Sequence, residues 1–117
     1  EKNIQFLGLV SDYKMPDIYS RAQAVIFPQA EDFGIVPLEA MASGRPVIAY
    51  RGGGALETIV EGETGIFFDE QTEISLARAI GQYYQTNFNP ELIRSHALKF
   101  DKAIFEKKML QFVLSLK

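Results

Sequence analysis

The sequence predicts an α/β domain in which a parallel sheet is covered by helices on both faces. Short apolar runs alternate along the chain with stretches of helical periodicity. The runs are apolar throughout, as in strands that are buried on both sides, and glycine or proline turns separate them from the helical stretches. A helical tail is expected to complete the chain.

Four of these apolar runs are predicted to be strands. They lie at residues 4–10, 24–27, 47–50 and 65–68. Gly62 and Gly65 bracket the turn before the last of them. Because parallel strands have their carboxyl ends at one edge, we expect the loops 29–34, 51–54 and 69–72 to meet there.

Helices are predicted at 15–21, 35–42, 55–60 and 72–84, with two more towards the end of the chain. Pro37 is tolerated in a first turn, and Gly44 with Pro46 ends that helix. Thr72 is a predicted cap. Pro90 is expected to begin a further helix and Asp101 to cap the last one.

Two of these helices show a face that can be read from spacing. In the helix capped by Thr72 the residues on one face are Ile74, Ala77, Ile80, Gly81 and Tyr84. The last helix has a core-facing stripe of Phe105, Met109, Phe112 and Leu116.

Composition limits the classes of protein that are open. The 117 residues suit one domain, 1–117, and the 47% hydrophobic and 23% charged content predicts a folded chain. The net charge of −3 argues against nucleic acid as the main partner. The chain has no cysteine, which fits a reducing compartment, so we expect a cytoplasmic protein, with the inner face of the membrane as the second location.

The stretch 31–50, EDFGIVPLEAMASGRPVIAY, contains the strongest functional signal. It places Glu31 and Glu39 on either side of a Phe33-Gly34 turn and the start of a helix. Backbone N–H groups at a helix N-terminus can hold a phosphate, and carboxylates can accept hydrogen bonds from sugar hydroxyls. The stretch therefore indicates a nucleotide-sugar site.

Other polar residues have a structural interpretation as well as a functional one. Glu31 and Asp32 could form a solvated loop, and the Gly52–Gly54 run reads more readily as a plain turn than as a phosphate loop. Arg51 and Gly53 lie on the expected rim and are candidate phosphate contacts.

Two further residues are expected to lie outside the site. Arg45, at the opposite end of its strand, is expected at the surface, and His96 on a solvated helix face. Ser43 has no base near it in sequence, so a histidine-based catalytic triad is not expected. No cluster has the spacing of metal ligands, so no metal is expected.

The stretch 25–68 resembles the carboxy-terminal, donor-binding domain of retaining GT-B glycosyltransferases of the group 1, family 4 type, which includes mannosyltransferases. The opening 6–10 also matches. The matching positions are Pro28, Glu31, Phe33, Gly34, 38–49, Gly52, Gly53, Glu57 and 62–65. The resemblance implies a Rossmann-like GT-B fold for this domain.

The resemblance also implies roles for individual residues. Glu31 and Glu39 correspond to the family's two acids, which have seven residues between them, and Glu31, as the catalytic residue, would contact hydroxyls of the transferred sugar. Glu39 would bind the ribose hydroxyls. The backbone of Phe33, Gly34, Ile35 and Val36 would face the sugar and the diphosphate, and Val10 and Asp12 the nucleobase.

The implied reaction moves a sugar from a nucleoside-diphosphate sugar to an acceptor hydroxyl with retention of configuration. The donor is the substrate, and neither a separate cofactor nor a metal is implied. The acceptor is a lipid carrier, a polysaccharide or a small molecule. An amino-terminal acceptor domain of the parent chain is the implied protein partner, so the isolated chain is expected to be inactive.

The chain departs from the family pattern at its beginning. It starts at Glu1 without a methionine, and the arginine and lysine that clamp the diphosphate in relatives are not found, so we expect a domain incomplete at its N-terminal side. In the usual strand order 3-2-1-4-5-6, residues 4–10 would be strand 3 and 24–27 strand 4. Either these two strands pair directly, or another copy of the chain covers the open edge.

Two other classes stay open at this stage. One is a sugar-nucleotide epimerase or phosphorylase of the same fold, and the other is a non-catalytic binding module. The donor base, the sugar, the acceptor and the oligomeric state are not readable from the sequence.

Overall fold

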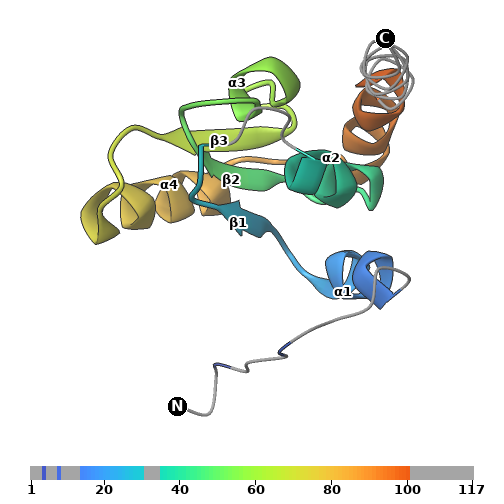
Figure 1. Cartoon of the computed structure of the whole chain (residues 1–117), viewed down its shortest axis with the longest axis horizontal. Coiled ribbons are helices and arrows are strands. Elements are labelled where there is room, and N and C mark those ends of the chain that lie inside the picture. Colours follow the sequence, from blue (N-terminus) through green and yellow to red (C-terminus); the bar gives the residue numbers. More distant parts are fainter. Residues whose placement is uncertain (1–3, 5–7, 9–13, 31–34, 101–117) are drawn as a thin grey trace, which may run out of the picture.

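The computed structural model describes residues 4, 8, 14–30 and 35–100, with the side chain of residue 35 excepted. Its elements are arranged as in Figure 1. In chain order they are α1 (Met15–Arg21), β1 (Val25–Phe27), α2 (Ile35–Ala42), β2 (Val47–Tyr50), α3 (Ala55–Thr58), β3 (Gly65–Phe68) and α4 (Glu73–Gln85). A further helix occupies residues 90–100.

The three strands form one parallel sheet in the order β1-β2-β3. Ile26 lies beside Ile48, which in turn lies beside Ile66, so the register is continuous across the sheet. This confirms the predicted α/β fold with a parallel sheet. The second and third strands have the predicted bounds, and β1 begins one residue later than predicted.

The predicted strand at 4–10 falls mostly outside the described residues. Ile4 and Gly8, which are described, are not in a strand, and Ile4 is 57% exposed. Within the described ranges nothing pairs with β1 on the side away from β2. A direct pairing of these two predicted strands is therefore not found there.

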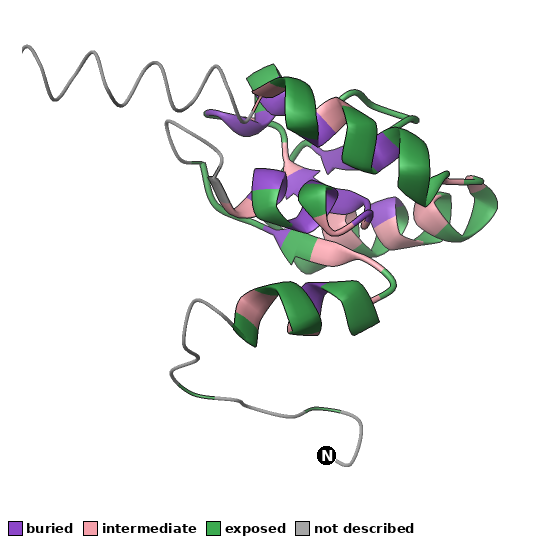
Figure 2. Ribbon diagram, turned by 90° about the vertical axis from the view of Figure 1, so that its right-hand side faces the viewer, coloured by how far each residue is buried: buried purple, intermediate pink, exposed green. Residues whose placement is uncertain are grey.

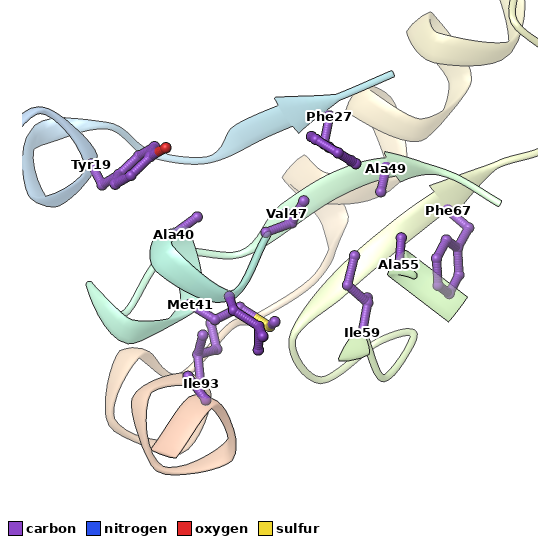
Figure 3. Packing of buried hydrophobic residues seen from close by; sticks show 12 residues of the cluster. Tyr19, Phe27, Ala40, Met41, Val47, Ala49, Ala55, Ile59, Phe67 and Ile93 are labelled. Atoms are coloured by element: carbon purple, nitrogen blue, oxygen red, sulfur yellow. The ribbon is translucent and has the colours of Figure 1, made fainter. Parts of the chain in front are cut away.

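Helices cover both faces of the sheet because successive strand residues point to opposite sides. On one side α4 packs on β2 and β3, over a buried cluster of Ile48, Ile66, Phe68 and Ala79. On the other side α1, α2, α3 and the helix 90–100 enclose a larger cluster (Figure 3). In Figure 2 the buried residues lie between these layers.

The end of α2 explains why glycine is needed at position 44. Gly44 has φ +79°, its N–H donates to Met41 O, and Arg45 N–H donates to Ala40 O. These two bonds form a Schellman motif, in which a residue of left-handed conformation satisfies the last carbonyls of a helix. The predicted stop at Gly44 is confirmed.

The face of α4 that was read from residue spacing is not the face that the structure buries. Ile74 and Tyr84 are 68% and 74% exposed, whereas Ala79 is buried. The side chains that pack on the sheet with Ala79 are Leu76, Ile80 and Tyr83. The helix has two adjacent apolar stripes, and spacing alone does not decide which of them is buried. Packing against the sheet buries the stripe that contains Ala79.

Two other expectations are also corrected. His96 is half-buried, its Nε2–H donates to Thr58 O at 2.7 Å, and its ring lies 4.9 Å from that of Phe100. Arg45 is half-buried rather than at the surface, because its guanidinium donates to the carbonyl of Ser20. Both side chains therefore join separate elements.

The helix predicted at 55–60 ends two residues early, at Thr58, and the remaining helix signals are confirmed where they are described. Thr72 Oγ1 accepts a hydrogen bond from Ser75 N–H at 3.2 Å and caps α4. A helix begins at Pro90, preceded by Asn89, whose side chain accepts from Glu91 N–H at 3.0 Å. Asp101 and the stripe at 105–116 lie outside the described residues. None of the described helices is long and apolar enough to cross a membrane.

Candidate functional site

The described residues that follow the three strands meet at the carboxyl edge of the sheet, as predicted. Gln71, after β3, donates from Nε2 to Pro28 O, after β1, at 3.0 Å. Arg51, after β2, donates from Nε to Asp69 Oδ1, after β3, at 2.6 Å. The loop after β3 therefore contacts the residues that follow β1 and the residues that follow β2. Ligands of open parallel sheets bind at this edge.

Glu39 is displayed on the exposed side of α2, the helix that follows the loop after β1. Its neighbours Leu38, Ala40 and Met41 are buried against the sheet, so the helix is anchored by these residues and presents Glu39 outwards. The Tyr19 hydroxyl donates to Glu39 Oε2 at 3.4 Å. The carboxylate thus has a partner on α1 and remains accessible.

A pocket of about 320 Å³ lies between α1 and α2, with Glu39 in its wall. Its lining residues are Met15, Pro16, Tyr19, Glu39, Ala42 and Ser43. The pocket combines apolar side chains with a carboxylate and two hydroxyls. Such a wall suits a ligand that carries both a flat apolar part and hydroxyl groups.

The phenol of Tyr19 is held in its neutral form. Burial, the charge of Glu39 and the hydrogen bond to Glu39 together raise the pKa of Tyr19, in that order of importance. A neutral phenol can donate a hydrogen bond, whereas an ionised carboxylate can only accept one. The hydrogen bond therefore runs from the Tyr19 hydroxyl to the Glu39 carboxylate.

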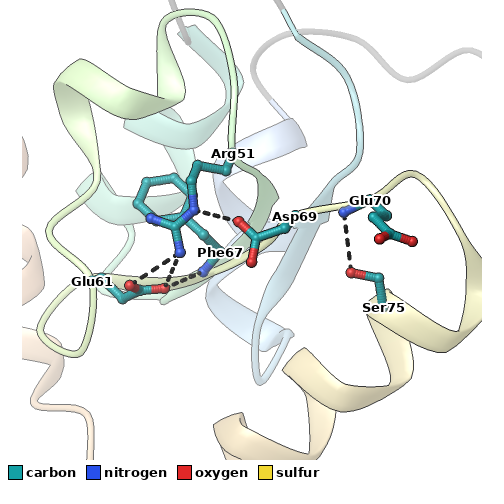
Figure 4. Close-up of polar contacts among 6 residues, drawn as sticks. All are labelled: Arg51, Glu61, Phe67, Asp69, Glu70 and Ser75. Atoms are coloured by element: carbon teal, nitrogen blue, oxygen red, sulfur yellow. Dashed lines mark hydrogen bonds and ion pairs between the residues drawn. The ribbon is translucent and has the colours of Figure 1, made fainter.

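Arg51 is engaged by two carboxylates and one aromatic ring (Figure 4). Besides the bond to Asp69, its Nη2 donates to Glu61 Oε2 at 3.2 Å, and its guanidinium carbon lies 4.8 Å from the centre of the Phe67 ring. The hydrogen bond to Asp69 is the main cause that raises the pKa of Arg51. A phosphate would have to compete with both carboxylates, so a phosphate contact from Arg51 stays a prediction.

The other predicted donor contacts divide into described and undescribed positions. Gly53 lies exposed on the rim with φ +60°, and Val36 is half-buried against the core cluster. Ile35 is the first residue of α2. The positions outside the described residues are Val10, Asp12, Glu31, Phe33 and Gly34.

Sequence reasoning missed three residues that contact predicted site residues. Tyr19 contacts Glu39, and Glu61 and Asp69 contact Arg51. Asp69 directly follows a strand, which is a signal that could have found it. Over the described ranges, no group of three or more histidine, aspartate and glutamate side chains is placed to hold a metal ion.

Together, a parallel sheet with contacts between the residues that follow its strands, and a neighbouring helix that carries Glu39, define an α/β domain with a candidate ligand site at the carboxyl edge. The chain belongs to the family of glycosyl transferases group 1, which matches residues 1–100. The family membership confirms the resemblance drawn from the sequence.

Named relatives agree with the family. The chain is 32% identical over 118 positions to D-inositol 3-phosphate glycosyltransferase of Corynebacterium urealyticum, which covers 97% of this chain and 28% of the relative. It is 33% identical over 125 positions to alpha-1,3/1,6-mannosyltransferase ALG2 of Mus musculus, covering 99% of this chain and 29% of that protein. The chain therefore spans less than a third of either relative.

Solved structures share the fold. Sucrose-phosphate synthase from Thermosynechococcus elongatus superposes with a TM-score of 0.74 at 26% identity, covering 99% of this chain and 31% of the synthase. Anabaena Alr3699/HepE, solved in complex with UDP and glucose, superposes with a TM-score of 0.67 at 24% identity. The superposition covers 100% of this chain and 33% of Alr3699/HepE. Both likenesses support the GT-B assignment of the domain.

Proposed function

We propose that this chain is the donor-binding part of a retaining glycosyltransferase. In this proposal the parent enzyme transfers a sugar from a nucleoside-diphosphate sugar to an acceptor hydroxyl. Membership of the glycosyl transferases group 1 family supports the assignment. The names of the matching relatives are those of glycosyltransferases, which does not favour an epimerase, a phosphorylase or a non-catalytic module.

The observation that carries the proposal is the position of Glu39. It is an exposed carboxylate on the helix that follows β1, in the wall of a pocket of about 320 Å³. A ribose offers two adjacent hydroxyl donors, and a carboxylate has about four acceptor sites with which to receive them. Glu39 is thus suited to hold the ribose of the nucleotide.

The start of α2 supplies the second part of the donor site. Its first N–H groups lack partners within the helix, and the helix dipole places partial positive charge there. A diphosphate at this point would be stabilised as it leaves with its developing negative charge, which is the main catalytic contribution we propose. Glu31, eight positions before Glu39 in the sequence, is proposed to contact the transferred sugar.

The remaining components follow from the same proposal. The donor is the substrate, and we propose no further cofactor. That Anabaena Alr3699/HepE was solved with UDP and glucose supports a nucleotide-sugar donor here. The acceptor is a lipid carrier, a polysaccharide or a small molecule, and the proposed location is the cytoplasm or the inner face of the membrane.

Calorimetric titration with GDP, UDP and ADP tests the proposal. We expect one nucleotide to bind the wild type and its affinity to fall at least tenfold in Glu39→Ala, because the ribose contact is lost. Glu91→Ala is the matched control, since it removes another exposed carboxylate from a helix that does not line the pocket. Equal affinity in wild type and Glu39→Ala would contradict the proposed role.

A further inference from the structure

Tyr19 is a core residue with a polar end at the candidate site. Its side chain is 7% exposed and belongs to the same buried cluster as Phe27 and Leu38. Its hydroxyl nevertheless reaches Glu39 Oε2 at 3.4 Å. Buried tyrosines of this kind use the ring for packing and the hydroxyl for one directed hydrogen bond.

The position of α1, and so of Tyr19, is fixed from two sides. Arg45, whose N–H forms one of the two bonds of the Schellman motif of α2, donates from its guanidinium to the carbonyl of Ser20 near the end of α1. Met15 and Tyr19 pack into the core cluster from the same helix. The ends of α1 and α2 are therefore joined, and the Tyr19 ring has little freedom to move away from α2.

This placement matters because Glu39 is otherwise a flexible, exposed side chain. A glutamate loses rotamer freedom when it is ordered, and a ligand that orders it carries that cost. A hydrogen bond from a rigid phenol holds one carboxylate oxygen before the ligand arrives. The remaining lone pairs stay open towards the pocket.

We propose that Tyr19 is a positioning residue: its hydroxyl orients the Glu39 carboxylate so that it can accept the ribose hydroxyls of the donor nucleotide. The inference rests on the proposed function and adds to it a residue of α1 that does not itself contact the nucleotide. The raised pKa of Tyr19 agrees with this role, because it keeps the phenol protonated and able to donate.

A double-mutant cycle on nucleotide affinity tests the inference in the full protein. The variants are Tyr19→Phe, Glu39→Ala and the two combined, titrated with the nucleotide that binds the wild type. We expect Tyr19→Phe to weaken binding about five- to tenfold, the usual size of one hydrogen bond, and to have no further effect in the Glu39→Ala background, where the phenol has no acceptor at position 39. An equal loss in both backgrounds would overturn the inference.

Tyr83→Phe is the matched control, because it removes a hydroxyl from a half-buried ring that packs against the core. Its phenol donates to Gln23 O at 3.3 Å, close to the length of the Tyr19 bond, but Gln23 lies before β1 at the other edge of the sheet. We expect unchanged nucleotide affinity in Tyr83→Phe. A loss equal to that of Tyr19→Phe would show that the effect is one of general stability, which would also overturn the inference.

A second measurement does not depend on nucleotide. Fluorotyrosine labelling lowers phenol pKa values into a range where proteins stay folded, and ¹⁹F NMR then follows each tyrosine, with Tyr19→Phe identifying the Tyr19 signal. In Glu39→Gln the pKa of Tyr19 should fall, because the nearby negative charge is removed. An unchanged Tyr19 pKa would overturn the inference.

The two measurements separate failure of this inference from failure of the proposed function. If Glu39→Ala weakens nucleotide binding and Tyr19→Phe does not, the proposed function stands and the positioning role alone is wrong. If Glu39→Ala leaves nucleotide binding unchanged, the proposed function fails, and the positioning role fails with it whatever the Tyr19 pKa does.

Discussion

Arg51 and Asp69, the residues that directly follow β2 and β3, form an ion pair with 2.6 Å between Nε and Oδ1. Glu61 binds the same guanidinium and also accepts a hydrogen bond from Phe67 N–H at 3.1 Å. One arginine thus joins the ends of two neighbouring strands to the segment that precedes β3. The carboxyl edge of the sheet, where the donor is proposed to bind, is held together by exposed charges.

Replacing Arg51 by alanine should lower the free energy of unfolding by about 1 kcal/mol. Exposed ion pairs contribute about 0–1 kcal/mol each, and the contact of an exposed guanidinium with an aromatic ring adds a similar amount at most. Arg51→Lys should recover less than half, because lysine cannot form both pairs in the same geometry. Urea denaturation measures the three forms.

Arg21→Ala is the control for this experiment. Its pair with Asp17 is a more exposed pair within one helix, at 2.8 Å, and should contribute only about 0.3–0.5 kcal/mol. An Arg51→Ala effect no larger than that of Arg21→Ala would show that the contacts of Arg51 add nothing to the edge.

Gly65 and Gly81 make a matched pair for alanine substitution. A Cβ on Gly65 would lie 2.3 Å from Val47 O, so Gly65→Ala should push β3 away from β2 and cost about 1–3 kcal/mol or more. Gly81 lies within α4, with nothing within 4 Å of an added Cβ, so Gly81→Ala should stabilise by about 0.5–1 kcal/mol. Thermal unfolding should move in opposite directions, and a destabilised Gly81→Ala would contradict this account of α4.

Local sequence signals were sufficient for most of the described fold. Glycine and proline residues gave the bounds of α2, β2 and β3 without error, and Thr72 was correctly predicted as the cap of α4. The backbone conformation at Gly44 and the hydrogen bond of Thr72 both depend on residues close by in the sequence. The buried face of α4 was not predicted, because it depends on which stripe meets the sheet. That choice is made by tertiary packing.

The site shows the same division. Glu39 was found because a carboxylate within an apolar helix is unusual, and the family resemblance gave it a role. Its partner Tyr19 is 20 positions away, and His96 and Thr58 are 38 apart. No periodicity or spacing links such pairs, because they are brought together only by the docking of helices onto a common sheet.

Ile93 should show how strongly the helix 90–100 is bound to the core. Its side chain is fully buried in the larger cluster, so Ile93→Ala should cost about 2–5 kcal/mol through lost burial and the cavity left behind. The neighbouring Leu92 is 51% exposed, and Leu92→Ala should cost less than half as much. Similar midpoints of urea unfolding for the two variants would contradict the observed orientation of this helix.

Thr72 should contribute to stability as the cap of α4. Thr72→Ala removes the acceptor for Ser75 N–H and should cost about 1 kcal/mol, whereas Thr72→Ser keeps an acceptor and should be close to wild type. Circular dichroism during thermal unfolding compares the three forms. A Thr72→Ser variant as unstable as Thr72→Ala would mean that the hydroxyl bond is not the cause.

Stability at alkaline pH should depend on Tyr19. Burial, followed by the charge and the hydrogen bond of Glu39, raises the pKa of Tyr19 above its ordinary value of 10.0. Above that value the unfolded chain loses the phenol proton while the folded chain keeps it. The free energy of unfolding contributed by Tyr19 is therefore constant below about pH 10 and falls as pH rises, by at most about 1.4 kcal/mol per pH unit.

Urea denaturation over a pH series that crosses the ordinary tyrosine pKa checks this dependence. Tyr19→Phe should show a shallower fall than wild type, since it has no phenol to ionise at that position. Glu39→Gln should lie between the two, because burial remains after the charge is removed. Tyr84→Phe, at a side chain that is 74% exposed, should follow the wild type. If wild type and Tyr19→Phe lose stability at the same rate, the phenol of Tyr19 is not held neutral by its surroundings, and the electrostatic contact with Glu39 is weaker than its geometry indicates.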